Sequence, residues 1–333
     1  MGATQKPLVV IVVVGETARA ANWGLNQSLY SQARDTTPEL KNLQVINFPR
    51  VEACGTNTEV SVPCMFSQLG HHRYNESAIR SQESVLHVLA RVGVRVHWRD
   101  NQSGCKGVCT GLPQDTTDAK MTPDLCAAGR CLDGALISDL DVRLAHAQGA
   151  QLWVLHQIGN HGPAYHRRYP PEFTHFQPAC QSDDLHRCTL NEIANAYDNA
   201  LRYTDHILAE TVRKLQAKSD SVDSALIYVS DHGESLGEKG LFLHGMPRAI
   251  APSEQLEVPM IAWLSAGLDA ARGGISGCIQ REFALAAQKN LSHDHLTHTL
   301  LGLFDVQTQA RDANFDLTQA CPTTQPSRQA SGS

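Results

Sequence analysis

The sequence lacks a long hydrophobic run, an excess of basic charge and a CxxC pair. The longest apolar run near the start, Pro7 to Val14, is far shorter than the ~20 residues that span a bilayer, and it is too short for a signal peptide. Lys and Arg number 28 against 34 Asp and Glu, so the net charge of −6 disfavours a nucleic-acid partner or a polybasic membrane patch. With 42% hydrophobic and 19% charged residues, the 333-residue chain has the composition of a globular protein.

Ten cysteines are present, and the first eight fall into four close pairs. Without a CxxC pair a structural zinc site is the weaker interpretation, whereas short local pairs are typical of disulfides in an oxidising compartment. We therefore predict Cys54–Cys64, Cys105–Cys109, Cys126–Cys131 and Cys180–Cys188, with Cys278–Cys321 as a longer fifth. Disulfides in a chain without a signal sequence favour an excised soluble domain of a longer protein.

Three apolar runs are each followed at once by polar residues that are common in catalytic sites. The runs are residues 8–14, 151–155 and 225–229. Continuous β-branched runs, apolar on both faces, predict buried central strands of a parallel sheet. Because ligands bind beyond the carboxyl ends of such strands, we expect the polar residues to converge on one edge of the sheet.

Segments with helical periodicity alternate with these runs, which predicts an α/β sandwich in a single domain. The helical segments are Ser84–Val92, Asn191–Leu215 and Ser292–Leu303, the last with Ser292 as its N-cap. Residues 102–135 and 163–190 carry most of the cysteine pairs and little periodicity, so we interpret them as stapled loops near the site. The Ser/Thr/Gln/Pro-rich end, residues 323–333, is expected to be disordered.

Glu16 and the pair Asp231-His232 stand directly after two of the predicted strands. An adjacent carboxylate and imidazole can both bind one cation such as zinc. Each also has an ordinary explanation, since a loop DH pair is usually polar surface and a carboxylate favours the positive end of a helix dipole. Their shared placement at strand ends favours the metal site.

The segment from Cys54 to Cys64, CGTNTEVSVPC, is rich in hydroxyl groups. A rigid loop entering a helix can hold a hydroxyl at the helix N-terminus, where an anion is stabilised. Contact with a metal lowers the pKa of such a hydroxyl and makes it a nucleophile. Chemistry alone does not rank Thr56, Thr58 and Ser61, and an ordinary N-cap is the alternative for Thr58.

His161 in GNHGP and His244 in LHGMP lie in loops that glycine and proline turn tightly, and such loops present a side chain. Either imidazole could bind a second metal or a phosphoryl oxygen, or it could simply bond to the backbone. We expect His156 to pack within its strand. The remaining histidines considered are His71 and His72, expected to be exposed, and His293, His295 and His298, expected to be structural or on the surface.

Five motifs in order between residue 8 and about residue 306 resemble the lipid A phosphoethanolamine transferases: VVVGETARA, CGTNTEVSVPCMFS, HQIGNHGPAY, YVSDHGESLGE and LHGMP. This family includes the mobile colistin-resistance enzymes and belongs to the alkaline phosphatase and sulfatase superfamily. The resemblance implies an α/β/α sandwich with a mostly parallel sheet. It also implies zinc-dependent transfer of phosphoethanolamine from phosphatidylethanolamine to a phosphate of lipid A, which confers polymyxin resistance.

The resemblance assigns roles to individual residues. It implies that Thr58 is the nucleophile and that one zinc ion is bound by Glu16, Thr58, Asp231 and His232. His161 and His244 would bind the phosphoryl group or a second zinc ion, and Glu234 would lie near the metal. The stretch WRDNQSGCKG, with Gln102, Ser103 and Lys106, resembles a segment that contacts the donor or the acceptor.

Three positions depart from the family pattern. Family members often have Asp where Ala21 stands, Asn where Gln102 stands and Tyr where Val60 stands. None of these positions is a metal ligand, so the departures concern substrate contacts. Because family members carry membrane helices before this domain, we expect residues 1–322 to be the catalytic domain of a monomeric protein at the periplasmic face of the bacterial inner membrane.

Two other functions fit parts of the sequence. A hydrolase of the same superfamily would use water as the final acceptor, and fold analogy alone does not separate it from a transferase. A sulfatase would need Cys or Ser in a C/S-x-P-x-R pattern, which the sequence around Thr58 lacks. A non-catalytic lipid-binding module has no reason to retain all six candidate site residues.

Overall fold

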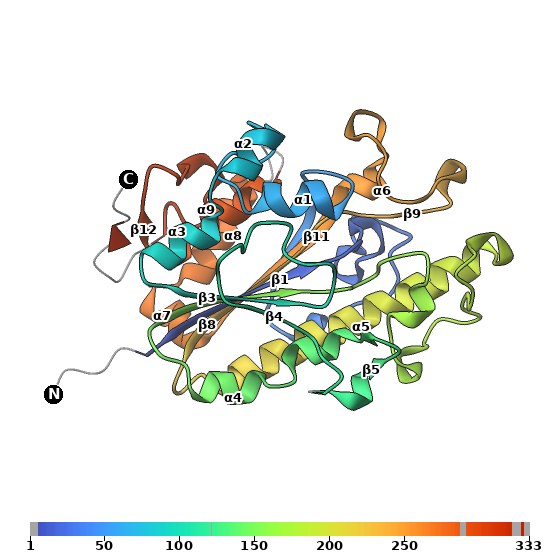
Figure 1. Ribbon diagram of the computed structural model, residues 1–333, viewed down its shortest axis with the longest axis horizontal. Coiled ribbons are helices and arrows are strands. Elements are labelled where there is room, and N and C mark those ends of the chain that lie inside the picture. The colour runs from blue at the N-terminus through green and yellow to red at the C-terminus, as the bar shows by residue number, and fades with distance from the viewer. Residues whose placement is uncertain (1–5, 121, 287–290, 322–327, 330–333) are drawn as a thin grey trace.

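The structure is a computed structural model that describes residues 6–120, 122–286, 291–321 and 328–329. A seven-stranded sheet crosses the centre of the molecule in the order β2-β11-β8-β1-β7-β3-β4 (Figure 1). Its strands are β1 (Leu8–Gly15), β2 (Ile46–Glu52), β3 (Arg95–Asp100), β4 (Gln114–Thr116), β7 (Ala150–His156), β8 (Asp223–Ser230) and β11 (Glu257–Leu264). Among the described strands of this sheet, β11 alone runs opposite to the other six, which confirms the predicted mostly parallel sheet.

The three predicted apolar runs are the three central strands, with β1 between β8 and β7. The register brings their carboxyl ends to one level, because Val14 is opposite His156 and Gly15 is opposite Ser230. The residues that follow each strand therefore emerge side by side at one edge of the sheet.

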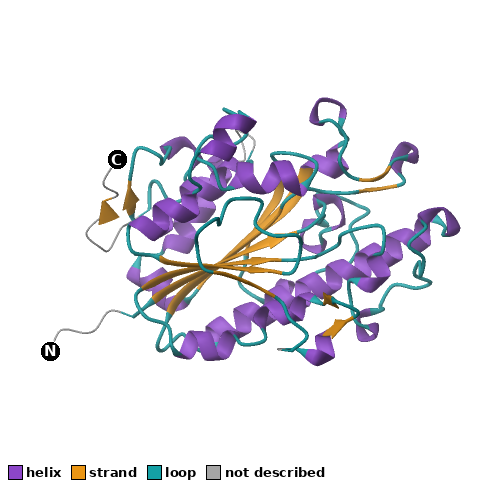
Figure 2. Ribbon diagram, viewed as in Figure 1, coloured by secondary structure: helices purple, strands orange, loops and turns teal. Residues whose placement is uncertain are grey.

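Helices cover both faces of the sheet, as Figure 2 shows. The described helices are α1 (Thr58–Met65), α2 (Glu76–Ser81), α3 (Val85–Arg91), α4 (Leu140–Ala145), α5 (Leu190–Gln216), α6 (Ser253–Leu256), α7 (Ala266–Ala271), α8 (Ile275–Ala286) and α9 (Asp294–Leu303). Even-numbered residues of β1 from Val10 to Val14 pack in a core with α1, α3, α8 and α9. Odd-numbered residues from Val9 to Val13 pack with α4 and α5, so the α/β/α sandwich is confirmed.

The predicted helices are present, but the start of α9 differs from the prediction. Ser84 is the N-cap of α3, whereas the N-cap position of α9 is His293 and not Ser292. The reason is that the backbone before α9 pairs with the end of β2. The Glu52 N–H donates to the Leu291 carbonyl at 2.9 Å, and the His293 N–H donates to the Glu52 carbonyl at 3.0 Å.

All five predicted disulfides are formed. They are Cys54–Cys64, Cys105–Cys109, Cys126–Cys131, Cys180–Cys188 and Cys278–Cys321. The first joins the loop before α1 to the last turn of that helix and so fixes the helix to its own entry loop.

Short strand pairs complete the described structure. They are β5 (Cys126–Ala127) with β6 (Arg130–Cys131), β9 (Ser235–Leu236) with β10 (Phe242–Leu243), and β12 (Val306–Gln307) with β13 (Arg328–Gln329). The predicted disordered tail, residues 323–333, lies outside the described residues apart from β13. Among the described helices, none combines the length and the apolar character that a membrane crossing requires.

We expect Val12→Ala to lower the free energy of unfolding by about 2–3 kcal/mol, because two methyl groups are lost from a fully buried position and leave a cavity. Val142→Ala in α4 is the matched control, since that side chain is 62% exposed and its change should stay within about 0.5 kcal/mol. Denaturant unfolding with the disulfides intact measures both variants. Equal losses for the two variants would contradict the placement of β1 at the centre of the core.

Candidate active site

Residues from three strand ends and one helix start meet at the carboxyl edge of the sheet. Glu16 directly follows β1, and Asp231 and His232 directly follow β8. Thr58 is the first residue of α1, and His161 lies in the loop after β7. Glu16, Asp231 and His232 are fully buried and Thr58 is 8% exposed, so the predicted convergence is confirmed.

Backbone hydrogen bonds hold the loop after β7 against Glu16. The Asn160 N–H donates to the Glu16 carbonyl at 3.0 Å. Gly159 has φ +46°, and a Cβ there would lie 2.7 Å from the Glu16 carbonyl oxygen, so only glycine allows this close approach. The buried Asp133 carboxylate accepts from the N–H groups of Ile158 and Gly159, both at 2.9 Å. This loop therefore presents His161 from a fixed backbone.

Glu16, Asp231 and His232 form a group that could hold a metal ion. One ligand atom from each lies within 4.8 Å of the others, and His232 Nε2 is 3.2 Å from Glu16 Oε1. Within the part of the chain that the structure describes, Glu16 Oε1, Asp231 Oδ2 and His232 Nε2 are buried without a partner in hydrogen-bonding geometry. Buried polar atoms without partners are costly, and a cation would satisfy all three. Carboxylate oxygens with an imidazole nitrogen are ligands that zinc takes.

The two buried carboxylates of this group are stabilised by a positive charge beside them. Burial and the negative charge of Glu16 raise the pKa of Asp231 above its ordinary value. Burial opposes ionisation of Glu16 as well, but the close contact with His232, whose Nε2 lies 3.2 Å from Glu16 Oε1, and the positive charge of that ring outweigh it and hold the pKa of Glu16 low. Burial disfavours the charged imidazole, but the two carboxylates outweigh it and raise the pKa of His232. A proton on His232 or a metal cation can supply the charge that both carboxylates need.

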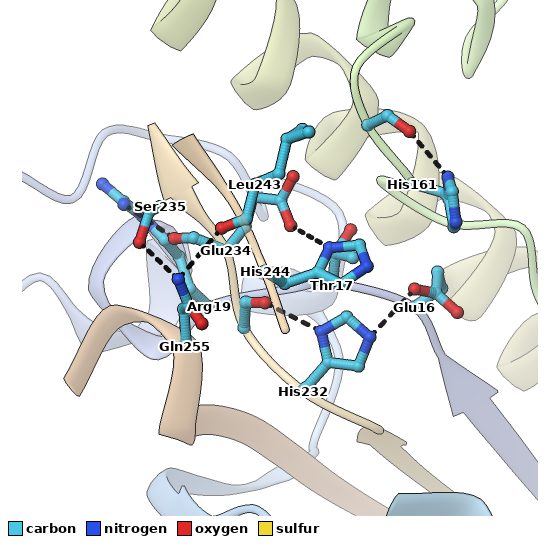
Figure 3. Close-up of polar contacts among 12 residues, drawn as sticks. Glu16, Thr17, Arg19, His161, His232, Glu234, Ser235, Leu243, His244 and Gln255 are labelled. Atoms are coloured by element: carbon cyan, nitrogen blue, oxygen red, sulfur yellow. Dashed lines mark hydrogen bonds and ion pairs between the residues drawn. The ribbon is translucent and has the colours of Figure 1, made fainter. Parts of the chain in front are cut away.

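The ligand atoms are oriented by contacts on their other sides. His232 Nδ1–H donates to the Gly233 carbonyl at 2.9 Å, which leaves Nε2 facing Glu16 (Figure 3). Asp231 Oδ1 accepts from the N–H groups of His232 at 2.8 Å and Thr17 at 3.3 Å. Thr17 has φ +55°, a conformation that costs free energy and turns its N–H toward Asp231. Such outer contacts fix the ligands before a metal binds.

Of the three candidate hydroxyls in the described loop and helix, that of Thr58 is the one that contacts the candidate metal-binding side chains. Its Oγ1 donates to Glu16 Oε2 at 3.0 Å. Thr56 Oγ1 donates to the Met246 carbonyl, and Ser61 Oγ accepts from the Gly55 N–H. The N-cap of α1 is Asn57, whose side chain accepts from the Val60 N–H, so the N-cap alternative for Thr58 is wrong.

His161 and His244 approach the same site from two further loops. Together with Glu16 they form a second group whose ligand atoms lie within 4.8 Å of one another. His161 Nδ1–H donates to the Gly162 carbonyl, and His244 Nδ1–H donates to Glu234 Oε2, both at 2.7 Å (Figure 3). Each ring therefore keeps Nε2 as the nitrogen available for a ligand.

Glu234 orients His244 while its other oxygen is also engaged. Glu234 Oε1 accepts from the Tyr165 hydroxyl at 2.6 Å. Both oxygens of this fully buried carboxylate are therefore occupied by the protein, which gives Glu234 the role of a support for His244. The same carboxylate also belongs to a group with His232 and His244 whose ligand atoms lie within 4.8 Å.

The predicted substrate segment reaches the site through a chain of side chains. Gln102 Nε2 donates to Glu16 Oε2 at 2.9 Å, and the Ser103 hydroxyl donates to Gln102 Oε1. Lys106 Nζ lies 2.6 Å from Ser103 Oγ and 2.6 Å from the carboxylate of Glu59, the residue after Thr58. Of the other two departures, Ala21 is buried beyond β1, and Val60 packs beside Gly55.

Asp100 was not among the predicted site residues, although it ends β3 at the same edge of the sheet. His156 Nδ1–H donates to Asp100 Oδ2 at 2.9 Å, so His156 does more than pack in its strand. Burial raises the pKa of Asp100, but the hydrogen bond with His156 outweighs it and holds the pKa at about 2. The other oxygen accepts from the N–H groups of Gln102 and Gly104, which fixes the substrate segment. Its place at a strand end was the signal that could have identified it.

The other histidines divide between surface and interior. His72 is exposed as predicted, but His71 is half-buried, which differs from the prediction. The Asp294 carboxylate accepts from the N–H groups of both residues and holds their loop against the protein. Three further histidines, which were expected to be structural or on the surface, are all buried: His293, His295 and His298.

The sulfatase family model matches residues 9–306 of this chain. The crystal structure of the soluble domain of lipooligosaccharide phosphoethanolamine transferase A from Neisseria meningitidis superposes with a TM-score of 0.88 at 41% identity, covering 97% of this chain and 95% of that one. The chain belongs to the phosphoethanolamine transferases of the sulfatase family. The integral membrane form of the N. meningitidis protein matches with a TM-score of 0.89 at 40% identity, covering 97% of this chain and 59% of that one.

Two curated members of the phosphoethanolamine transferase family are also similar in sequence. Phosphoethanolamine transferase EptA of Escherichia coli K12 is 42% identical, over 94% of this chain and 56% of that protein. Phosphatidylethanolamine transferase Mcr-1 of E. coli is 43% identical, over 91% of this chain and 54% of that protein. The chain thus spans about half the length of the curated relatives that it matches.

We expect His232→Ala to weaken binding of Zn²⁺ at least tenfold, because it removes one of the three buried ligand atoms. His206→Ala is the matched control. His206 belongs to the half-buried group with Glu39 and Glu210, where Arg213 already pairs with both carboxylates. Competition with a chromogenic chelator measures both affinities. Loss of the tight site in the His206 variant, but not in the His232 variant, would contradict the assignment.

Proposed function

We propose that this chain is the catalytic domain of a zinc-dependent enzyme that transfers phosphoethanolamine from phosphatidylethanolamine to a phosphate of lipid A. The observation that carries the proposal is the Thr58 hydroxyl, which donates to Glu16 at 3.0 Å inside a buried group of metal-binding side chains. The similarity to relatives named phosphoethanolamine and phosphatidylethanolamine transferases supports the same chemistry.

In the proposed first step Thr58 Oγ1 attacks the phosphorus of phosphatidylethanolamine. The bond between phosphorus and the diacylglycerol oxygen breaks, and diacylglycerol leaves with the proton that the Thr58 hydroxyl loses. When bound, zinc would lower the pKa of this hydroxyl and offset the negative charge that develops on the phosphoryl oxygens. Thr58 also stands at the start of α1, where the helix dipole favours an anion.

In the proposed second step a phosphate oxygen of lipid A attacks the phosphorus held on Thr58. The bond to Thr58 breaks, and Thr58 regains its hydroxyl with the proton that the attacking phosphate hydroxyl of lipid A loses. His161 and His244 present imidazole nitrogens beside Glu16 and are placed to bind the phosphoryl oxygens in both steps. Gln102, Ser103 and Lys106 would contact the headgroup of the donor or the acceptor.

We place the catalytic domain, residues 1–322, at the periplasmic face of the inner membrane, as the soluble part of a longer membrane protein. Support comes from the five disulfides, which suit an oxidising compartment, and from the match to 59% of an integral membrane relative. The transferred group brings an ammonium to lipid A, which weakens the attraction of cationic polymyxins. We therefore propose that the activity confers colistin resistance.

The decisive test is the intact mass of the zinc-loaded protein after incubation with phosphatidylethanolamine. We expect a gain of one phosphoethanolamine group in the wild type and none in Thr58→Ala or after zinc is chelated. Thr56→Ala is the matched control, and it should still form the adduct because its hydroxyl bonds to the Met246 carbonyl.

A second measurement separates transfer from hydrolysis. With a lipid A acceptor present, phosphoethanolamine should be transferred to lipid A faster than it is released by reaction with water. Faster release to water would favour a hydrolase of the same superfamily, and an adduct that persists in Thr58→Ala would overturn the role of Thr58.

A further inference from the structure

We propose that His293 is a positioning residue whose imidazole sets the distance between the nucleophile Thr58 and the metal ligands Asp231 and His232. The inference deepens the proposed function and rests on it. Its basis is a single buried ring that joins the nucleophile loop, residues 53–58, to the carboxyl end of β8.

The imidazole of His293 makes two directed hydrogen bonds. Its Nδ1 accepts from the Cys54 N–H at 3.1 Å, and its Nε2–H donates to the Ser230 carbonyl at 2.9 Å. A backbone N–H on one side and a carbonyl on the other admit one tautomer only, the neutral ring with its proton on Nε2. The side chain is 1% exposed, and burial lowers the pKa of His293 to about 4, so the ring is neutral near pH 7.

The two backbone groups stand next to the reacting residues. Ser230 is the last residue of β8, and Asp231 and His232 follow it directly. Cys54 precedes Thr58 by four residues, and its disulfide to Cys64 ties that loop to the end of α1. A shift of either backbone group would therefore change the distance from Thr58 to the metal ligands.

The two strands that lead to these residues are not neighbours in the sheet. The nucleophile loop follows β2, and the ligands follow β8, but β11 lies between these two strands in the sheet order. The backbone connects the two loops through the residues before β11, since the Ala53 N–H donates to the Leu256 carbonyl and the Gly233 N–H donates to the Gln255 carbonyl. His293 joins the two segments directly.

The first turns of α9 also hold the far end of α1. Asp294 accepts from the N–H groups of His71 and His72, in the loop that follows α1. Thr297 Oγ1 donates to the carbonyl of Met65, the last residue of α1. His293 and the first turns of α9 therefore contact both the loop that enters the nucleophile helix and the end of that helix.

A space-filling role would not need two directed hydrogen bonds. Leucine could occupy most of the volume of His293, but it would leave the Cys54 N–H and the Ser230 carbonyl without partners. Small errors in the placement of reacting groups cost about 100-fold in rate. The positioning role therefore predicts a loss of rate that exceeds any loss of substrate binding.

The test compares three variants in the full zinc-loaded chain. His293→Leu removes both hydrogen bonds, His293→Asn keeps an acceptor for the Cys54 N–H, and His293→Gln keeps a donor for the Ser230 carbonyl. We expect kcat for transfer to fall about tenfold or more in the Leu variant, with KM for the donor within about twofold of wild type. The Asn and Gln variants should each recover part of kcat.

His298→Leu is the matched control because His298 lies in α9, the helix that His293 caps, is equally buried, and accepts from the Asp312 N–H away from the site. We expect it to keep the wild-type kcat even where it lowers stability. An unchanged kcat in His293→Leu, or equal losses in His293→Leu and His298→Leu, would overturn the proposal. Should the Leu variant fail to fold, kcat and KM of the Asn and Gln variants decide by the same criterion.

Failure of the proposed function gives a different result. A wild type that binds zinc but transfers nothing would contradict the transferase, and hydrogen exchange of the peptide containing Cys54 would then decide the role of His293. Faster exchange in His293→Leu than in His298→Leu supports the bridge between the two loops, and equal exchange overturns it.

Discussion

Two carboxylates, Glu16 and Asp231, are buried side by side with one imidazole, and the rest of the site depends on how their charge is balanced. Burial opposes the ionisation of both groups, so the arrangement is stable only with a positive charge among them. The atoms that point inward, Glu16 Oε1, Asp231 Oδ2 and His232 Nε2, face one another without hydrogen-bonding geometry in the described structure, whereas the outer atoms of Asp231 and His232 are held by backbone N–H and carbonyl groups. The protein thus prepares a cation site and places the Thr58 hydroxyl inside it.

The fold meets this constraint through the register of three strands. Because β8, β1 and β7 end at one level, Glu16, Asp231 and the loop with His161 emerge together. Thr58, the proposed nucleophile, comes from outside this set, on a helix that follows β2, and three further contacts fix the segments around it. Gln102 contacts Glu16, His293 joins the loop before Thr58 to the end of β8, and the Cys54–Cys64 disulfide fixes that loop to α1.

The local patterns in the sequence were enough to predict the central strands, the disulfides and the convergence of Glu16, Asp231 and His232 at the strand ends. They were not enough to rank Thr58 above Thr56. The family resemblance favoured Thr58, and the contact of Thr58 with Glu16 supports that choice. His293 was not recognised, because its role rests on partners more than fifty residues away that leave no local pattern, whereas the place of Asp100 at the end of β3 was a pattern that could have identified it. The late start of α9 has the same origin, since pairing with the end of β2 overrides the local capping signal.

Anomalous diffraction at the zinc edge from crystals of the zinc-loaded protein would show where the metal binds. We expect a strong peak among Glu16 Oε1, Asp231 Oδ2 and His232 Nε2, within bonding distance of Thr58 Oγ1. Zinc bound only elsewhere, for example at Glu39, His206 and Glu210, or no zinc at all, would contradict it.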